Sequence, residues 1–429
     1  MLSTSLSRRR HRVALAAPSP SRDRRVTTGL YVLGAVTFGA FLPSSLHPGH
    51  RPALRTEALP LTPVLAVSVL VGALALLLLG PLSDAFGARP VLRAGIVTAA
   101  LGSACSALAP STGWLLAGGA AQGLALGAAT GAAATLVSGG RGRFSRRRGA
   151  VATGLAFVSG TAAGTCAGGV LAQYAPAPHV LPYALHLVLL VPAWGRVTAL
   201  EPAPAAARRS PRLRPRAARV PAGTRALFAT ASAVGFLAWA TAGLFLAVLP
   251  TLPARAGAHG TAVTGCALGG VWACSALVQP LAGRLDAHHA QLVGLGALLA
   301  ALSVPAVTAG RFAPLTLCAA VVAGAGHGLA HAGSVAAVDA RAPRGTRGGV
   351  TGALYLFFLL GCGVPALALG LLSPAFPPAA VVSVTASVAA VLVLPVSAAV
   401  AEVDRGVRTA PSGVVMYLDT RSLRDEVSA

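Results

Sequence analysis

The sequence predicts an all-α integral membrane protein whose twelve transmembrane helices form two pseudo-symmetric six-helix bundles. Three observations predict this class: a strongly apolar composition, twelve apolar runs of membrane-spanning length, and a basic connection that divides the runs six and six. Hydrophobic residues make up 55% of the 429 positions and charged residues 10%, with a mean hydropathy of +0.72. Soluble domains carry about 25% charged residues, so we expect a lipid bilayer around most of this chain.

The apolar runs follow one another with short polar connections between them. Each has about 20 residues, enough at 1.5 Å rise per residue to cross a hydrocarbon core of roughly 30 Å. Because backbone groups in lipid must satisfy their own hydrogen bonds, we expect each run to be a helix. The runs lie at residues 27–46, 61–79, 91–109, 113–138, 150–173, 180–200, 226–249, 261–282, 291–309, 312–338, 349–372 and 379–401.

The distribution of arginine predicts the orientation of these helices. All 34 basic residues are arginine, and thirty of them fall on the cytoplasmic side if the N-terminus is cytoplasmic. This bias satisfies the positive-inside rule and predicts a multi-pass plasma-membrane protein with both termini in the cytoplasm. No aromatic residues are interleaved with the arginines, so the net charge of +23 does not indicate nucleic-acid binding. The lack of lysine, with heavy use of Ala, Gly, Pro and Val, suggests a high-GC bacterial genome.

Composition divides the chain into five segments. The Pro- and Arg-rich connection between the sixth and seventh runs is the longest basic one, as expected of a cytoplasmic linker between two bundles. The basic N-terminal segment is predicted to be a disordered tail that anionic lipids attract to the cytoplasmic surface. The segments are the N-terminal tail at 1–26, the first bundle at 27–200, the linker at 201–225, the second bundle at 226–402 and the C-terminal tail at 403–429.

The two halves resemble each other in sequence. Asp84 follows the second run and Asp286 follows the eighth, 202 residues later. Gln122 in the fourth run and His327 in the tenth are 205 residues apart, and both precede Gly-Leu-Ala. These matching separations predict two parallel repeats. The repeat counterpart of the turn at Asp84 consists of Gly283, Leu285 and Asp286.

A charged turn between the second and third runs is the most specific motif. It has the pattern Gly-x-Leu-x-Asp-x-x-Gly-x-Arg, formed by Gly80, Leu82, Asp84, Gly87 and Arg89. The pattern resembles the signature loop between helices two and three of the major facilitator superfamily of transporters, and the chain resembles that family's twelve-helix exporters of drugs and small molecules. Ala88 stands where the family commonly has a second basic residue.

This resemblance implies a mechanism for the turn. Two bundles would rock about a central cavity, and Asp84 would contact the opposite half near the start of helix eleven to hold the cytoplasmic side shut. Arg89 is the second candidate for such a gate. The alternative is a solvated surface loop.

Two runs carry a glycine every four residues, a spacing typical of close helix packing. The segment from Gly160 to Gly169 resembles the glycine-rich fifth-helix motif of the superfamily's antiporters, with Thr165 in place of proline, and this favours export. The glycine rows fit either a mobile seam between bundles or ordinary packing of small residues. They consist of Gly119, Gly123, Gly127, Gly160, Gly164 and Gly168.

Polar and aromatic residues near the middle of the runs are candidates to line the cavity. His327 and His331 are four residues apart and share a helix face, and histidine is suited to proton exchange. The alternative is a neutral histidine hydrogen-bonded to a neighbouring helix, and the lone His186 is a weaker candidate. Aromatic rings with few charges fit an aromatic or amphipathic substrate. The main candidates are Tyr31, Gln122, Trp239, Trp272, His327, His331 and Tyr355, and the wider set adds Thr37, Ser159, Thr241 and Gln279.

No cofactor or metal is expected. The six cysteines fall inside apolar runs without metal-ligand spacing, so we interpret them as small buried residues that form no disulfide. None of the eleven acidic residues lies in the middle of a run. Gly119 stands where proton-linked members of the superfamily carry arginine, so any proton coupling would depend on the histidines.

These observations predict a monomeric secondary active transporter, not an enzyme, that works by alternating access. We expect it to export a small hydrophobic or drug-like molecule in exchange for protons, with the proton gradient as energy source. An importer or uncoupled facilitator of the same fold is the alternative. A membrane enzyme or a non-transporting sensor is a remote one, because the sequence has no Gly-x-Ser-x-Gly or His-Glu-x-x-His motif and no long soluble segment.

Overall fold

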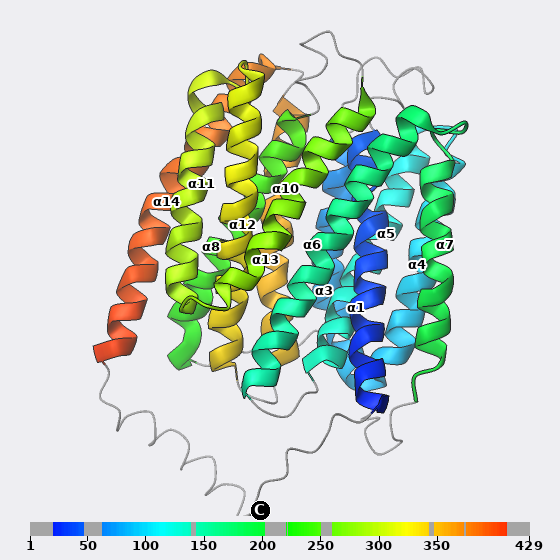
Figure 1. Cartoon of the computed structure of the whole chain (residues 1–429), viewed down its shortest axis with the longest axis horizontal. Coiled ribbons are helices and arrows are strands. Elements are labelled where there is room, and N and C mark those ends of the chain that lie inside the picture. The colour runs from blue at the N-terminus through cyan, green and yellow to red at the C-terminus, as the bar shows by residue number, and fades with distance from the viewer. Residues whose placement is uncertain are drawn as a thin grey trace, which may run out of the picture.

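The computed structural model describes residues 20–46, 62–138, 143–201, 220, 222–249, 260–342, 347–372 and 375–409. These residues contain twelve long α-helices that run up and down between two ends of the molecule (Figure 1). The first six are α1 (Pro20–Phe41), α3 (Thr62–Phe86), α4 (Ala88–Ala107), α5 (Thr112–Ser138), α6 (Arg143–Tyr174) and α7 (Leu181–Thr198). The second six are α8 (Arg225–Val248), α10 (Thr261–Ala282), α11 (Ala287–Thr308), α12 (Ala313–Arg341), α13 (Arg347–Leu372) and α14 (Pro378–Thr409).

The helices confirm the predicted fold class. Ten of them are long and apolar enough to cross a bilayer, α3 contains a shorter apolar stretch at Ala66–Leu79, and α7 is the remaining one. The start of α1 and the end of α14 lie at the same end of the molecule, which we call the terminal end (Figure 1). The opposite end is called the distal end. Each of the twelve predicted runs corresponds to one helix, so the chain is a multi-pass membrane protein.

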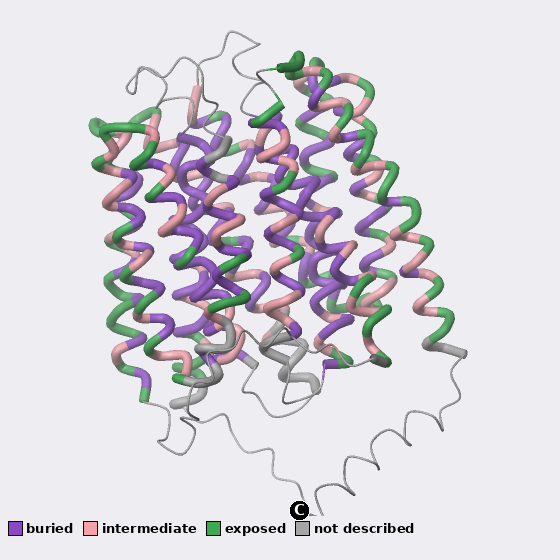
Figure 2. The backbone as a smooth tube through the Cα atoms, turned by 180° about the vertical axis from the view of Figure 1, so that it is seen from behind, coloured by how far each residue is buried: buried purple, intermediate pink, exposed green. Residues whose placement is uncertain are grey.

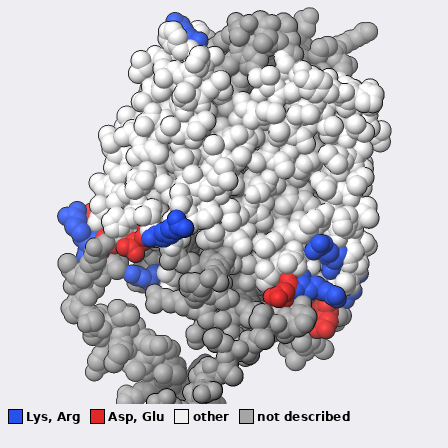
Figure 3. All heavy atoms as spheres, in the orientation of Figure 1, with Lys and Arg blue, Asp and Glu red and all other residues white. Residues whose placement is uncertain are grey.

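Burial and charge follow the pattern of a protein surrounded by lipid. Buried residues gather in the interior of the bundles, and exposed residues lie along the outer helices (Figure 2). Large apolar side chains such as Leu277, Val307 and Leu371 are exposed. Described Lys, Arg, Asp and Glu side chains gather at the terminal end on the face shown in Figure 3, and the middle of that face carries none. An apolar belt between polar ends is what a bilayer requires.

The helices form two six-helix bundles that meet along two helix pairs. The first six helices pack mainly against one another, as do the second six, and the bundles meet where α6 packs on α10 and α3 on α13. Figure 1 shows α6 and α10 side by side in the middle of the molecule. This boundary is the surface along which the two bundles could move relative to each other.

The predicted glycine rows pack helices within the first bundle. Gly123 lies against the Ser68 carbonyl of α3, and Gly164 lies against the Phe38 carbonyl of α1, so a side chain at either position would strike backbone. The other members of the rows make the same kinds of contact: Gly119 and Gly127 with α3, Gly160 with α1, and Gly168 with Leu42 and Ser45, which follow α1. The rows therefore make ordinary intrabundle contacts.

Different glycines form the closest contact between the bundles. A Cβ on Gly169 of α6 would lie 2.7 Å from the Cα of Gly265 on α10, a separation that only two glycines allow. Nearby, the Ala262 amide donates to Oε1 of Gln173 over 2.9 Å, and the Thr261 hydroxyl donates to the Gly169 carbonyl over 3.2 Å. These contacts close the boundary at its distal end.

Several predicted boundaries need correction. Helix α1 begins at Pro20, so residues 20–26 are helical and not part of a disordered tail, and Asp23 in the first turn suits the positive end of the helix dipole. Helix α14 likewise continues through residues 403–409, which were predicted to belong to the C-terminal tail. Most of the N-terminal tail, the linker and the C-terminal tail lies outside the described residues.

The turn at Gly80 to Arg89 is also tighter than predicted. Helix α3 continues to Phe86 and α4 begins at Ala88, so Gly87 alone separates the two helices. Its φ of 84° lies in the left-handed region, which explains why glycine is needed there.

The cysteines depart from the prediction in one respect. Cys266 and Cys318 are exposed, and only Cys362 is classed as buried. A thiol is apolar enough to face lipid, so the apolar runs did not reveal which faces are buried.

Candidate functional site

Five of the predicted cavity residues meet at the centre of the molecule. Trp239, Trp272, His327, His331 and Tyr355, here called the central cluster, come from α8, α10, α12 and α13 and are each at most 2% exposed. The ring centroids of Trp239 and His327 are 5.0 Å apart, those of Trp272 and His327 are 5.2 Å apart, and those of His331 and Tyr355 are 5.7 Å apart. The second bundle thus supplies a continuous aromatic and imidazole surface.

Close packing of α12 on α10 and the register of α12 position the two histidines. Gly324 and Gly328 lie against the Val271 and Ser275 carbonyls of α10, which allows the backbones to approach closely. His327 and His331 are one turn apart on α12. Their rings stack with centroids 5.6 Å apart and planes 15° apart. The i, i+4 spacing noticed in the sequence therefore places both imidazoles in one site.

The first bundle closes the other side of the cluster with phenylalanines. Phe157 of α6 meets Trp239 edge to face at 5.3 Å, and Phe41 of α1 meets Trp272 at 5.9 Å. The central cluster therefore lies at the boundary between the two bundles and not inside either one.

Hydrogen bonds fix one tautomer in the cluster. The Trp239 indole can only donate, and it donates to Nδ1 of His331 over 3.2 Å. A neutral His331 must then carry its proton on Nε2. The Ser275 hydroxyl bonds Nδ1 of His327 at 2.8 Å, where either atom can be the donor. Because a hydroxyl can rotate, this second bond permits either tautomer of His327.

Several buried polar atoms in and beside the cluster have no hydrogen-bond partner among the described residues. They are Nε2 of His327, Nε2 of His331, Nε1 of Trp272 and both amide atoms of Gln279. A buried polar group without a partner costs about 1–3 kcal/mol. Such groups commonly mark places where a ligand or water completes the hydrogen bonding.

Gly154 of α6 marks the point where some of these atoms converge. A methyl group built on Gly154 would lie 2.9 Å from Oε1 of Gln279 and 3.3 Å from Nε2 of His331. Glycine at 154 keeps this position free of a side chain from the first bundle. Gln279 belonged to the wider set of sequence candidates, and the structure makes it a central one.

Gln122 lies in a separate network inside the first bundle. Its amide donates to Oγ of Ser103 over 2.9 Å, and that hydroxyl lies 2.6 Å from Nδ1 of His186. Nε2 of His186 bonds the Ala35 carbonyl at 3.0 Å, so Nδ1 accepts from Ser103 in the neutral ring. This network ties α1, α4, α5 and α7 together, which makes His186 a structural residue.

Tyr31 also lies apart from the central cluster. Its hydroxyl donates to the Leu189 carbonyl of α7 over 3.1 Å, and the Arg196 guanidinium lies 4.8 Å from its ring centroid. These contacts hold α1 on α7 within the first bundle.

The charged turn makes its described contact within its own bundle. Arg89 donates from Nη2 to the Thr198 carbonyl at the end of α7 over 2.8 Å. A cation at the C-terminal end of a helix is favourable, so Arg89 stabilises the packing of α4 on α7. The burial and contacts of Gly80, Leu82 and Asp84 are not among those that the structure describes. The gating role of Asp84 therefore stays a prediction.

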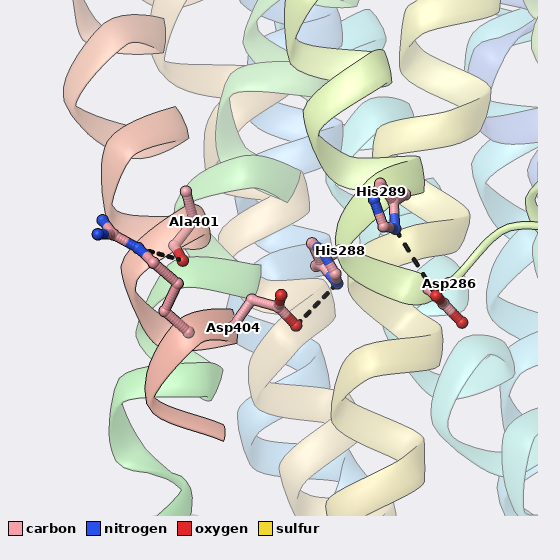
Figure 4. Close-up of polar contacts among 6 residues, drawn as sticks. Asp286, His288, His289, Ala401 and Asp404 are labelled. Carbon is pink, nitrogen blue, oxygen red and sulfur yellow. Dashed lines mark hydrogen bonds and ion pairs between the residues drawn. The ribbon is translucent and has the colours of Figure 1, made fainter. Parts of the chain in front are cut away.

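The repeat counterpart of this turn has a different form. Helix α10 ends before Gly283, Leu285 lies in the connecting turn, and Asp286 is the N-cap residue of α11. The Asp286 carboxylate lies 3.7 Å from Nδ1 of His289, and the neighbouring His288 bonds Asp404 of α14 at 2.9 Å (Figure 4). The second pair fixes the terminal ends of α11 and α14 to each other.

Sequence reasoning missed four contributors to the site: Phe41, Phe157, Ser275 and Gly154. Phe41 and Phe157 resemble any other apolar residue of their runs, and Gly154 resembles any packing glycine. Ser275 could have been noticed because it lies three residues from Trp272, on the same helix face. Among the described residues, no group of three His, Cys, Asp or Glu side chains could hold a metal ion.

Two six-helix bundles with a buried aromatic and polar cluster between them define a class of membrane transporters that bind solute at the boundary between repeats. The sequence profile of the Major Facilitator Superfamily matches residues 26–364, and the chain belongs to this superfamily. Membership in this superfamily supports a transporter.

Comparison with solved structures agrees on the fold. The crystal structure of the human organic anion transporter MFSD10 (TETRAN) superimposes with a TM-score of 0.70 and 18% sequence identity, over 89% of this chain and 100% of that one. No curated protein matches the chain.

Proposed function

We propose that this transporter works by alternating access and exports a small hydrophobic or drug-like molecule from a bacterial cell in exchange for protons. The observation that carries the proposal is the position of the central cluster. It lies between the bundles, where a bound solute would face either side as the bundles rock. Aromatic walls with few fixed charges fit a substrate held mainly by apolar contact.

Under this proposal, two contacts near the distal end would change during transport. The hydrogen bonds from Ala262 to Gln173 and from Thr261 to Gly169 join the two bundles. Both would break if the boundary opened at that end. With both termini in the cytoplasm, as the arginine bias favours, the distal end faces the exterior of the plasma membrane.

Proton coupling is assigned to the histidines. His327 and His331 are the histidines of the central cluster, histidine is the side-chain type best suited to proton exchange, and both residues lie at the boundary between the bundles. Export is favoured by the resemblance of the Gly160 to Gly169 segment to the antiporter motif. The similar human protein is an organic anion transporter, which supports a small organic substrate for this chain.

An uncoupled facilitator or importer of the same fold is the second candidate. Gly119 favours it, because this position carries arginine in proton-linked members of the superfamily. In the structure a Cβ on Gly119 would lie 3.0 Å from the Val64 carbonyl of α3, which leaves no room for an arginine side chain in this packing.

Proton movement in proteoliposomes separates the two candidates. The protein is reconstituted, an inward proton gradient is imposed, and lumenal pH is followed while neutral, anionic and cationic aromatic compounds are added. Substrate-dependent proton flux that disappears in a His327→Gln, His331→Gln double variant supports antiport. Equilibration of the same compounds without proton flux would show a facilitator. His289→Ala, at an exposed terminal position, is the matched control.

A further inference from the structure

The central site carries a hydrogen-bond donor whose direction is fixed by the protein itself. Because Trp239 donates to Nδ1 of His331, the neutral imidazole presents an N–H at Nε2. That nitrogen is buried and has no partner among the described residues. It lies close to the Gly154 backbone of the first bundle, because a methyl group built on Gly154 would be 3.3 Å from it.

Two further buried donors lie on the same side of the second bundle. The Gln279 side chain is fully buried with neither amide atom paired, and its Oε1 lies 2.9 Å from the same built methyl group. The Trp272 indole N–H, two turns earlier on α10, is likewise unpaired and can only donate. The central cluster therefore holds two obligate donors, His331 and Trp272, and the Gln279 amide beside His331 can donate or accept.

Among the described residues, no acidic side chain lies beside His331 and Gln279 to balance the charge of a cationic ligand. Along α12, the described acid that follows His331 is Asp339, eight residues or roughly two turns further toward the terminal end. The other described acids, such as Asp286 and Asp404, lie at helix ends. Burying a cation without a carboxylate partner costs free energy, whereas buried N–H groups can donate hydrogen bonds to a carbonyl or carboxylate oxygen.

We infer that the substrate is an aromatic molecule carrying a carbonyl or carboxylate oxygen, which accepts hydrogen bonds from Nε2 of His331 and from the Gln279 amide. This inference rests on the proposed function and narrows its substrate class by excluding cationic drugs. The rings of Trp239, Phe157 and Tyr355 hold the aromatic part.

Binding to the purified full-length protein tests the inference independently of transport. Four naphthalene compounds of similar size serve as probes: naphthalene carboxylate, acetylnaphthalene, ethylnaphthalene and naphthylmethylammonium. Affinity is measured by equilibrium dialysis in detergent, with protein-free micelles subtracted. We expect the carboxylate or the ketone to bind about tenfold more tightly than the hydrocarbon, because a site built for an acceptor rejects a ligand that lacks one. The cation should bind most weakly.

Three variants test which residues cause the preference for a ligand with an acceptor oxygen. Gln279→Leu and His331→Phe should each lower the preference for the ketone over the hydrocarbon toward unity while the hydrocarbon's own affinity changes little. Gly154→Ala adds a methyl group within 3.3 Å of Nε2 of His331 and of Oε1 of Gln279, and it should weaken binding of the ketone selectively. Gly270→Ala is the matched control, because a Cβ there meets nothing within 4 Å. Unchanged preference in all three variants would overturn the inference, even if Gly154→Ala folded poorly.

Flux of the same compounds into proteoliposomes separates this inference from the proposed function. Transport with equal affinity for ketone and hydrocarbon would overturn the inference and leave the transport proposal standing. A strong acceptor preference in binding without any flux would support the binding site and count against the proposed transport. Tightest binding of the cation would overturn the inference.

Discussion

The Sγ atoms of Cys166 and Cys266 lie 3.5 Å apart across the boundary between the two bundles, the first on α6 and the second on α10. Gly169 and Gly265, which touch backbone to backbone, lie close by along the same helices. The two thiols therefore report whether the bundles are in contact near the distal end.

Oxidation of this thiol pair should arrest transport. Copper phenanthroline with dioxygen would remove one hydrogen from each thiol and join the sulfurs, so the bundles could no longer part at the distal end. We expect transport to stop and to recover after reduction with dithiothreitol. Cross-linking is measured on gels after cleavage at a protease site inserted between residues 202 and 219. Cys166→Ser should abolish both effects, and Cys318→Ser should leave them intact. Full transport by the cross-linked protein would contradict alternating access at this boundary.

The two histidines should differ in their effect on pH dependence. A proton added to Nδ1 of His331 would face the Trp239 N–H that now donates to this nitrogen, so protonation must break that hydrogen bond. His327 can take a proton and keep its bond to Ser275, because the hydroxyl can accept as well as donate. His327→Gln should therefore flatten the pH profile of transport. His331→Gln should preserve the profile and weaken substrate binding by about threefold to tenfold. Transport assays between pH 5 and 8 test this difference, within the range where histidine commonly titrates.

Glycine at position 169 should be required for α6 and α10 to pack closely at the boundary between the bundles. A Cβ on Gly169 would lie 2.7 Å from the Cα of Gly265, so Gly169→Ala must push α6 and α10 apart. Overpacking of this kind costs about 1–3 kcal/mol. We expect lower transport and slower cross-linking of Cys166 with Cys266. Gly296→Ala, whose Cβ would meet nothing within 4 Å, is the control. Equal cross-linking rates in the two variants would disprove the tight contact.

Two residues of the charged turn should have different roles, Asp84 in gating and Arg89 in stability. Arg89→Gln loses a charged hydrogen bond to the Thr198 carbonyl and should reduce thermal stability, by about 1–2 kcal/mol. Asp84→Asn, in contrast, should cut transport sharply while expression and membrane insertion stay normal. Thermal unfolding and flux of both variants, measured in parallel, test this division. A stability loss in Asp84→Asn as large as that in Arg89→Gln would argue against a gate.

The network around His186 should be purely structural. Ser103→Ala would leave Nδ1 of His186 without its donor and remove one partner of Gln122, at a cost of about 1–3 kcal/mol. The melting temperature should fall while the pH profile of the remaining transport is unchanged. Ser303→Ala, which removes only an exposed bond to its own helix, is the control. A shifted pH profile in Ser103→Ala would assign His186 a role in coupling.

The sequence was sufficient for the membrane fold because lipid imposes one rule on every residue of a span. An apolar run of about 20 residues must become a helix, so each of the twelve runs has its helix in the structure. The sequence was less informative about where helices begin and end. Helices α1 and α14 extend beyond the apolar runs into residues 20–26 and 403–409, where hydropathy carries no signal for the helix.

The candidate site was only partly determined by sequence. The spacing of His327 and His331 fixed their common face, and scarce mid-span aromatics identified Trp239, Trp272 and Tyr355. The same reasoning could not separate these residues from Gln122 and Tyr31, whose partners on α4 and α7 give them structural roles. Only the tertiary structure decided that Gly154 faces His331 and Gln279, and that Gly169 and Gly265 hold the boundary. The physical reason is that side-chain contacts across two bundles depend on which face of each helix meets which neighbour. Hydropathy specifies burial in the membrane but carries no information about the partner.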